Sequence, residues 1–522
     1  MSFTAPDIDY AGLSPVIALT AGICVVLLGG LVWRGRWVAT LLTLAALATA
    51  AGLCIWQWRE SGDLVAGALR LDDLGLAISL MAITAAAFVT PLSLREPAAE
   101  RAGHADFQAL LLGSTLGMVL LAQAQNLIAL FVAIELLSVP LYVLCGSSLH
   151  RPESLESGLK YLIVGSLGSA TLLYGLAFIY GGSGSTDFTG IRDGIEAGGL
   201  LDDPLVLIGI GLAGTGLAFK VSLAPFHQWT PDVYQGAPTP VTAFMAVATK
   251  AAAFCVFLRF FDVALGPSVA DWDGPLAVIG AVSIAVGNIG ALGQDSVKRL
   301  LGYSGIAQAG YMLVGIVVAS ELGAQALVFY LAAYTLMNMP AFAVVAIRER
   351  ETGLGDDISA LQGLGRDRPE LAWPITISML ALAGLPGTTG FIGKLYLIEA
   401  AVEGDYTWLA VTIAIGTMVS LAYYLRIVAA VWMRPAAEPA APGGVPAIAG
   451  GSPDADAQPA DPPPAGPRPG RDAAGVPTGG RCPVVLVPTA LAAAATIVFG
   501  IVPSPLVDWA ANAGESLAPF LG

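Results

Sequence analysis

The stretch GLAFKVSLAPFHQWTPDVYQG, residues 216–236, places an ammonium group at the end of an uncharged, helix-forming run. The preceding residues, PLVLIGIGLAGTG, carry no charge, and Lys220 is followed by Pro225 and His227. Because proline lacks a backbone donor and clashes with the preceding turn, it predicts a break in this helix. The carbonyl groups freed by a break inside a membrane must line a cavity or meet water. Transporters place their ion sites at such broken helices.

The composition indicates that lipid surrounds this stretch. Hydrophobic residues make up 56% of the 522 positions and charged residues 12%, with a mean hydropathy of +0.74, whereas a soluble domain has about 25% charged residues. Apolar runs of roughly 17 to 25 residues span the hydrocarbon core. We therefore predict an all-α integral membrane protein with about fourteen transmembrane helices. The predicted spans are 14–33, 37–57, 73–91, 107–123, 126–148, 155–182, 204–230, 239–262, 274–293, 299–319, 322–347, 370–402, 406–433 and 482–506.

The distribution of Lys and Arg among the loops predicts the orientation, since cytoplasmic loops carry the excess. With the N-terminus outside, the inside loops hold fifteen basic residues and the outside loops three. The acidic N-terminus, MSFTAPDIDY, lacks the basic region of a cleavable signal peptide. We expect a multi-pass protein of a bacterial cell (inner) membrane, with its N-terminus and C-terminus outside.

Most lysines of this sequence lie inside predicted membrane spans. The chain has only five lysines, and four lie inside predicted spans, while arginine supplies nearly all of the loop charge. Arginine stays protonated in proteins, whereas a desolvated lysine can release its proton. The span lysines are therefore candidates for proton exchange, and static pairing or snorkelling to an interface is the alternative. They are Lys160, Lys220, Lys250 and Lys394.

Other charged residues in the spans are few. Glu135, in NLIALFVAIELLSVPLYVLCG, is the one carboxylate that the sequence places deep within a span. A charge at mid-bilayer costs about 2.5 to 3.5 kcal/mol on insertion scales, and an ion pair between Glu135 and a lysine would reduce that cost. Arg259 and Arg426 lie near span ends, where snorkelling is the favoured interpretation.

A second interrupted span follows at LAGLPGTTGFIGKLYLIEAA, where glycines and a proline between 384 and 390 precede Lys394. Two interrupted spans, each with a lysine, suggest an internal repeat. FLRFF (257–261) aligns with YLRIV (424–428), which sets the first interrupted span against the second. Because each unit would contain an odd number of spans, five, the second would be inverted relative to the first.

Five stretches of the chain, in order and spacing, resemble one family. They are LFVAIELLSVPLYVLCG, ESGLKYLIVGSLGSATLLYGLAFIYG, FKVSLAPFHQWTPDVYQGAPTPVTAFMAVATKAAAF, GQDSVKRLLGYSGIAQAGYMLVG and LAGLPGTTGFIGK. Together they cover roughly residues 105–430. The chain resembles the N subunits of proton-pumping NADH:quinone oxidoreductase, respiratory complex I, which are antiporter-like membrane subunits.

The resemblance implies a fold of fourteen helices with two inverted five-helix repeats, two broken helices and a hydrophilic axis. The implied segments are the N-terminal transmembrane helices 1–3 (1–104), the first antiporter-like repeat with helices 4–8 (105–262), the second inverted repeat (274–434), a disordered cytoplasmic linker (435–480) and the last transmembrane helix (481–522).

The resemblance also implies a function, proton translocation coupled to NADH oxidation and quinone reduction in partner subunits. Redox energy would open and close a Glu135–Lys220 pair and drive a proton toward Lys250 and then Lys394. His227 would act as a relay or water-organising group between Lys220 and Lys250, and Lys160 fits the same pattern. The implied translocation residues are Glu135, Lys160, Lys220, His227, Lys250 and Lys394.

Other chemistry is not indicated by the sequence. The five cysteines lie singly, without the spacing of an iron–sulfur site or a disulfide framework, and of the three histidines only His227 falls in a span. We expect no metal and no cofactor bound by this chain. NADH, FMN, iron–sulfur clusters and quinone would belong to partner subunits, so the chain would be part of an enzyme without a redox site of its own. Expected partners are neighbouring antiporter-like and small membrane subunits of complex I and the lipid bilayer, with no nucleic acid.

Two alternatives stay open at this point. The chain could serve a Mrp-type cation/proton antiporter or a membrane-bound hydrogenase, which share the module. It could also be a membrane scaffold whose charges only hold helices together. The scaffold hypothesis predicts that loss of a lysine disturbs assembly and leaves pumping by assembled complexes intact.

Overall fold

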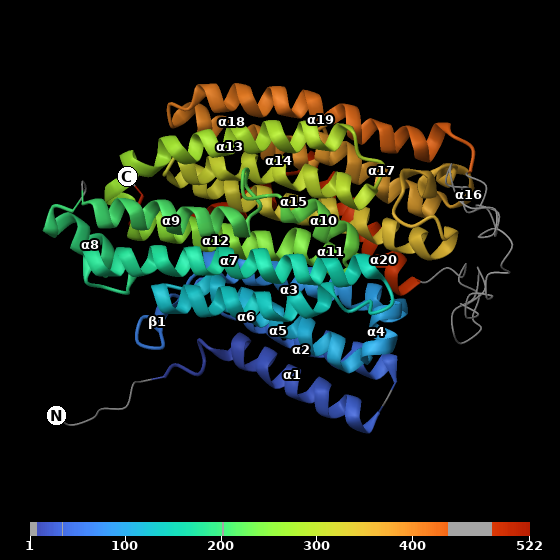
Figure 1. The fold of residues 1–522 in the computed structure, drawn as a ribbon, viewed down its shortest axis with the longest axis horizontal. Coiled ribbons are helices and arrows are strands. Elements are labelled where there is room, and N and C mark those ends of the chain that lie inside the picture. The colour runs from blue at the N-terminus through green and yellow to red at the C-terminus, as the bar shows by residue number, and fades with distance from the viewer. Residues whose placement is uncertain (1–7, 34, 201–202, 437–482, 522) are drawn as a thin grey trace, which may run out of the picture.

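The computed structural model describes residues 8–33, 35–200, 203–436 and 483–521. Long helices lie side by side in a bundle, and the chain progresses across it from α1 at one edge to α18 and α19 at the other (Figure 1). The long elements are α1 (Ser14–Val32), α2 (Arg36–Trp56), α3 (Asp73–Leu92), α5 (His104–Gln123), α6 (Leu127–Cys145), α7 (Pro152–Ser183), α9 (Pro204–Lys220), α13 (Val269–Leu292), α14 (Val297–Val317), α15 (Glu321–Thr352), α17 (Pro369–Ala383), α18 (Thr389–Glu403), α19 (Thr407–Met433) and α20 (Pro483–Ile501).

Shorter elements complete or connect the bundle helices. One span is assembled from α11 (Thr239–Phe244), a π-helical segment (Met245–Thr249), α12 (Lys250–Leu258) and a second π-helical segment (Arg259–Ala264). The others are α4 (Pro97–Ala102), α8 (Phe188–Gly198), α10 (Trp229–Gly236), α16 (Leu364–Asp367), α21 (Ser504–Glu515), three short 3-10 segments (Ser93–Arg95, Gly266–Ser268 and Ile358–Leu361) and the antiparallel strands β1 (Gly62–Leu64) and β2 (Leu69–Leu71).

The predicted class, an all-α membrane protein with two broken helices, is confirmed. Within the described residues, twelve helices are long and apolar enough to cross a membrane. The two other predicted spans, 204–230 and 370–402, are the interrupted ones. The first contains α9 and the break as far as the start of α10, and the second contains α17 and α18. The total of fourteen and the inverted repeat stay predictions. The predicted linker 435–480 lies outside the described residues from 437 onward.

Local backbone geometry explains both interruptions. After α9 the chain turns at Ser222, whose φ is 67°, a left-handed conformation that non-glycine residues seldom adopt. After α17 it turns at Gly384, with φ 78°, where the missing Cβ makes the left-handed cap inexpensive. The sequence signals for the two breaks therefore mark true helix ends.

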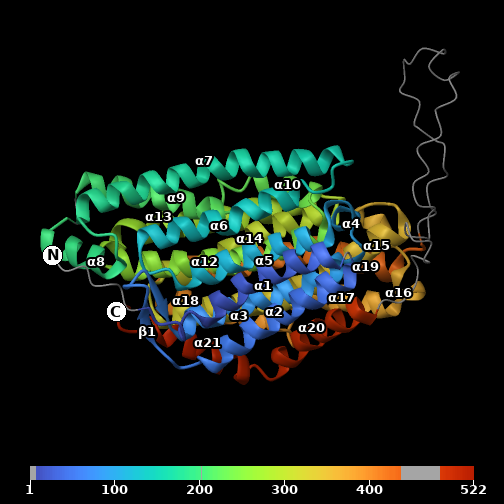
Figure 2. The ribbon, with the colours of Figure 1, turned by 90° about the horizontal axis from the view of Figure 1, so that it is seen from below.

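The buried centre of the bundle is made of α12, α14 and α15. The span that contains α12 is wholly buried, and α14 and α15 are nearly so, while α7 and α20 lie on opposite faces of the molecule (Figure 2). Close packing depends on glycine where helices touch. A Cβ on Gly287 of α13 would collide with the backbone of α14 at Ala307, so the small residue permits this approach.

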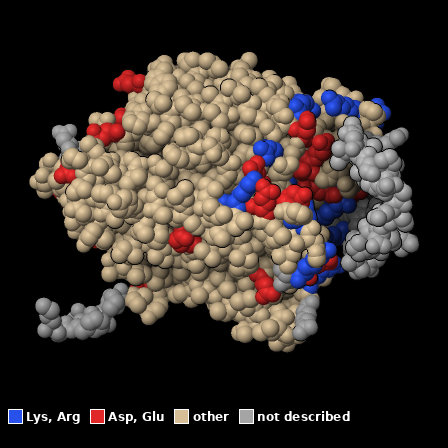
Figure 3. Space-filling model, viewed as in Figure 1, with Lys and Arg blue, Asp and Glu red and all other residues tan. Residues whose placement is uncertain are grey.

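Charged side chains gather at one end of the bundle, the end that carries α4 and α16, which we call the charged end (Figure 3). Ion pairs there join Arg36 to Glu100, Arg350 to Glu96, Arg368 to Glu351 and Arg426 to Asp295. The chain enters α1 and leaves α21 at the opposite end (Figure 2).

Candidate functional site

Lys220 is the last residue of α9, and its side chain is almost completely buried. Its Nζ donates to Ser138 Oγ at 2.6 Å and to Tyr161 Oη at 3.4 Å, and lies 5.6 Å from the centre of the Tyr161 ring. The last four carbonyl groups of a helix lack intrahelical partners and carry a partial negative charge. The break therefore places the ammonium where the end of the helix favours a cation.

Glu135 lies on α6, one turn before Ser138, and is half-buried. Its Oε1 is buried without a hydrogen-bond partner. No ion pair joins it to Lys220, whose ammonium is held by Ser138 instead. The structure thus brings the two predicted residues into one region, with the predicted pair open.

Lys250 begins α12, directly after the π-helical segment Met245–Thr249, and is 1% exposed. Its Nζ donates to Gly305 O on α14 and lies 5.8 Å from the centre of the Tyr334 ring on α15. Insertions of this kind are frequent at functional sites because they change the direction of the side chains that follow. Nothing in the sequence reasoning pointed to this π-helical turn.

Lys394 lies on α18, after the second break, and is 3% exposed. Its Nζ donates to Leu382 O at 3.0 Å and lies 5.1 Å from the centre of the Tyr311 ring. Leu382 is the second-last residue of α17, so its carbonyl is one of those that the helix end leaves free. Both predicted broken helices therefore place a lysine at the carbonyl end of a helix.

A chain of neutral polar groups connects the surroundings of Lys250 with those of Lys394. Gln308 of α14 donates from Nε2 to Leu382 O and to Tyr424 Oη, each at 3.4 Å, and accepts from Tyr330 Oη. The Tyr424 hydroxyl is hydrogen-bonded to Ser304, the neighbour of Gly305. Sequence reasoning missed these residues, although Ser304, Gln308 and Tyr311 are spaced to share one helix face.

His227 lies in the interruption between α9 and α10 and is half-buried. Its Nδ1 is buried without a partner, and no hydrogen bond joins its ring to Lys220 or Lys250. The structure places it beside the break, as the sequence predicted, and not in direct contact with either lysine.

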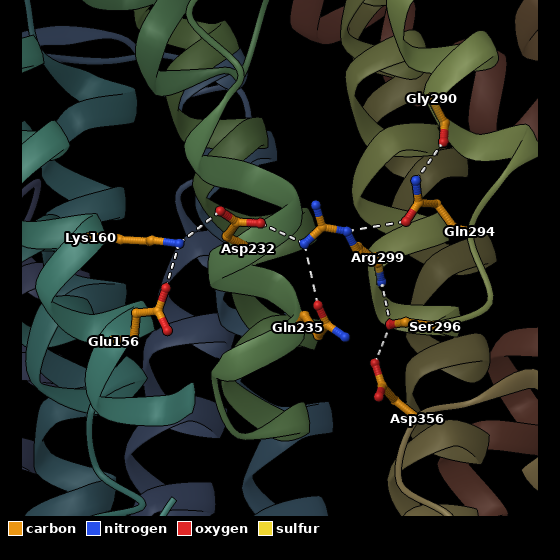
Figure 4. Close-up of polar contacts among 9 residues, drawn as sticks. All are labelled: Glu156, Lys160, Asp232, Gln235, Gly290, Gln294, Ser296, Arg299 and Asp356. Carbon is orange, nitrogen blue, oxygen red and sulfur yellow. Dashed lines mark hydrogen bonds and ion pairs between the residues drawn. The ribbon is translucent and has the colours of Figure 1, made fainter. Parts of the chain in front are cut away.

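Unlike Lys220, Lys250 and Lys394, Lys160 belongs to a partly exposed cluster of ion pairs. Its Nζ contacts Glu156 at 2.6 Å and Asp232 at 2.9 Å, and Asp232 also pairs with Arg299 (Figure 4). Its side chain is 41% exposed. We call Lys160, Asp232 and Arg299 the three-charge bridge.

The interpretation of Arg259 as a snorkelling residue is wrong. Arg259 is 1% exposed, pairs with Asp72 at the start of α3 and donates from Nε to Ala122 O at 2.9 Å. Asp262, one turn later, is a second deeply buried carboxylate that the predicted span boundary had placed at an edge. Position along the chain could not show either environment.

Lys298, predicted at a loop, is buried as well. It donates to Ala237 O at 3.0 Å and lies 3.4 Å from Glu349. Within the described residues there is no cluster of three or more His, Cys, Asp or Glu side chains arranged to hold a metal ion.

Residues 124–420 match the family described as NADH:quinone oxidoreductase/Mrp antiporter, transmembrane. The chain is 38% identical to NADH-quinone oxidoreductase subunit N of Trichlorobacter lovleyi over 397 residues, 76% of this chain and 82% of that protein. It is 35% identical to the protein of the same name in Desulforamulus reducens, over 91% of both chains.

Solved structures agree with these similarities. A chain of respiratory complex I from Thermus thermophilus with bound aureothin superposes with a TM-score of 0.76 at 32% identity, over 95% of this chain and 99% of that one. A chain of the Mrp complex from Dietzia sp. superposes with a TM-score of 0.81 at 21% identity, over 97% of both chains, which shows a shared fold.

Proposed function

Because the chain belongs to the family of NADH-quinone oxidoreductase subunit N, we propose that it translocates protons through its buried lysines. The chain is a membrane subunit of NADH:quinone oxidoreductase, and its partners are other subunits of that complex. We infer that NADH, FMN, iron–sulfur clusters and quinone are bound by those partners. A Mrp-type role is not proposed, since both relatives described above carry the subunit N name.

The observation that carries this proposal is the set of partners of Lys220, Lys250 and Lys394. Lys220, Lys250 and Lys394 are held by hydroxyl and carbonyl oxygens, and within the described part of the chain none has a carboxylate in an ion pair. Burying a charge without a counterion is costly. A lysine avoids that cost by releasing its proton, which arginine cannot do. Three such groups in one bundle suit a pathway along which a proton is passed.

Glu135 supplies the switch in the proposed mechanism. When its carboxylate approaches Lys220, the pair stabilises the charged ammonium; when the pair is open, as here, Lys220 has only neutral partners and passes its proton on. The proton then reaches Lys250 and, through the neutral chain at Gln308, Lys394.

The remaining predicted residues act on this path in supporting roles. His227, beside the break, would organise water between Lys220 and Lys250. Lys160 would contribute through its ion pairs.

The proposed orientation follows from the charges. The charged end faces the cytoplasm of a bacterial cell, so that the N-terminus and C-terminus lie outside. Protons are taken up from the cytoplasmic side and released outside, against about 2.3 kcal/mol per charge for each 100 mV of membrane potential.

Proton pumping by membrane vesicles that carry Lys250→Ala tests the proposal, with NADH as electron donor and assembly checked on native gels. We expect normal assembly and a fall in both quinone reduction and pumping. Cys255→Ala, a buried change on the same helix, is the matched control. Unchanged pumping by the assembled Lys250→Ala complex would favour the scaffold hypothesis.

A further inference from the structure

We propose that Asp232 is a positioning residue that fixes α10 between α7 and α14 and thereby sets the place of the Lys220 ammonium. The inference rests on the proposed function of Lys220 in proton transfer. The members of the three-charge bridge do not contact Lys220. The proposal gives them an indirect part in the reaction, through the position of α10.

The two oxygens of Asp232 are held by cations from two different helices. Oδ2 accepts from Lys160 Nζ of α7 at 2.9 Å, and Oδ1 accepts from Arg299 Nη1 of α14 (Figure 4). Asp232 itself belongs to α10, the short helix that follows the break. A single carboxylate thus connects the helix after the break to a neighbour on each side.

The same two elements meet again one step deeper, at Lys220. Tyr161 follows Lys160 on α7, and Trp229 precedes Asp232 by one turn on α10. The two rings stack with centroids 4.8 Å apart and planes 15° from parallel. Tyr161 Oη also contacts Lys220 Nζ. The Lys160–Asp232 ion pair and the Tyr161–Trp229 stack are therefore two successive contacts between α7 and α10, and the second adjoins the Lys220 ammonium.

Trp229 touches the backbone next to Lys220 as well. Its Nε1 donates to Phe219 O at 3.3 Å, and its side chain is nearly completely buried. A shift of α10 therefore moves both the aromatic neighbour of Lys220 and the last turn of α9. The position of α10 cannot change without changing the surroundings of the ammonium.

The α14 side of the bridge leads to Lys250. Arg299 lies on the helix whose Gly305 carbonyl accepts from Lys250, and Arg299 Nη1 also contacts Gln235 Oε1 at 3.3 Å. The adjacent Lys298 donates to Ala237 O, at the end of α10. The start of α14 thus contacts α10 at several points. These contacts couple the surroundings of Lys220 to α14, the helix whose Gly305 carbonyl accepts from Lys250.

The bridge is within reach of solvent. A cavity of about 330 Å³ is lined by Glu156, Lys160, Asp232 and Asp356, among others. Ion pairs that contact solvent are weaker than buried ones, so the bridge can break and re-form without the loss of the fold. Its partial exposure and its two carboxylate partners also explain why Lys160 can hold a permanent charge more easily than Lys220, Lys250 and Lys394.

Rescue by a conservative variant separates positioning from proton transfer at Lys160. In assembled complexes, Lys160→Met should lower NADH-driven quinone reduction and pumping on the order of tenfold, the scale that a small misplacement of reacting groups produces. Lys160→Arg should restore most of that loss, because arginine keeps the ion pair with Asp232. If Lys160→Arg is as impaired as Lys160→Met, Lys160 must release its proton and the positioning role is overturned.

The pH dependence of turnover tests whether Asp232 acts on Lys220. Asp232→Asn should lower turnover similarly and shift its pH profile, since Lys220 then meets changed surroundings. Asp295→Asn, which removes the partner of Arg426 at the charged end, should leave the profile unchanged. If Asp232→Asn fails to assemble, Lys160→Met takes its place in this comparison, because Asp232 then keeps Arg299.

A double variant decides whether Asp232 acts through the Trp229 stack. Trp229→Leu combined with Asp232→Asn should be no worse than Trp229→Leu alone, because residues in one chain of contacts are not additive. Multiplied losses would show two independent effects and overturn the proposal. Normal pumping by an assembled Lys220→Ala complex would instead refute the proposed function. That result differs from either outcome of the double variant, which tests only the positioning role of Asp232.

Discussion

The neutral chain between Lys250 and Lys394 leads to a prediction for Gln308→Leu. Leucine is similar in size but makes none of the three hydrogen bonds of Gln308. In this variant Leu382 O still accepts a hydrogen bond from Lys394, and the Tyr424 hydroxyl is still hydrogen-bonded to Ser304. Only the buried Tyr330 hydroxyl loses its hydrogen-bond partner. One buried unsatisfied group costs about 1–3 kcal/mol, which a large bundle tolerates. We therefore expect the complex to assemble.

Proton transfer should suffer more than stability does. The two bonds from Gln308 Nε2 are long, 3.4 Å each, and such bonds contribute about 0.5 to 1 kcal/mol apiece. A loss of about 1–2 kcal/mol in the transfer step slows it about fivefold to thirtyfold. Both NADH-driven quinone reduction and dye-detected acidification of vesicles should fall by this factor.

Gln325→Leu is the matched control for this experiment. Gln325 of α15 also accepts from a tyrosine, Tyr396, at 2.8 Å, but makes no contact with Lys250 or Lys394. We expect near-normal pumping from it. Wild-type rates in Gln308→Leu, in a complex that assembles fully, would refute the neutral chain as a proton path.

Three further predictions concern pumping and packing. Gln308→Glu should assemble and yet pump less than Gln308→Leu in the same vesicle assay, because a carboxylate between two lysines holds their protons. Arg259→Gln should remove the buried cation of Asp72, leaving Arg70 at 3.7 Å as its ion-pair partner, and cost up to about 3–5 kcal/mol, seen as loss of assembled complex on native gels. Gly287→Val should push α13 from α14 and cost about 1–3 kcal/mol, measured as a lower melting temperature, whereas Gly52→Val, at a position with open space, should not.

The helix breaks and the span lysines were predictable because their signals are local. Pro225 and the glycines between 384 and 390 act on their own turns, and a lysine within an apolar run is conspicuous at any position. The structure places both breaks where the sequence does, with a lysine at each. These are the features that decide the fold class and most of the candidate site.

The partners of Lys220 and Lys250, and most other polar contacts of the site, were not predictable because they come from distant parts of the chain. Ser138 is 82 residues from Lys220, and Gly305 is 55 residues from Lys250. Gln308 and Tyr424 are 116 residues apart, Asp232 and Arg299 are 67 apart, and Arg259 and Asp72 are 187 apart. The same limit explains the error on Arg259, whose place near a span end resembles that of a snorkelling residue.

The breaks and the lysines belong to one physical solution. A buried ammonium needs acceptors, but a carboxylate in permanent contact would hold its proton too firmly for transfer. A helix end offers carbonyl oxygens that have no partner within the helix and a partial negative charge. Leu382 O meets this need at Lys394, while Lys220 lies in the last turn of α9 and donates to the hydroxyls of Ser138 and Tyr161, so both have acceptors without a full counterion. Interrupting a helix is therefore a way to bury a lysine that can still give up its proton.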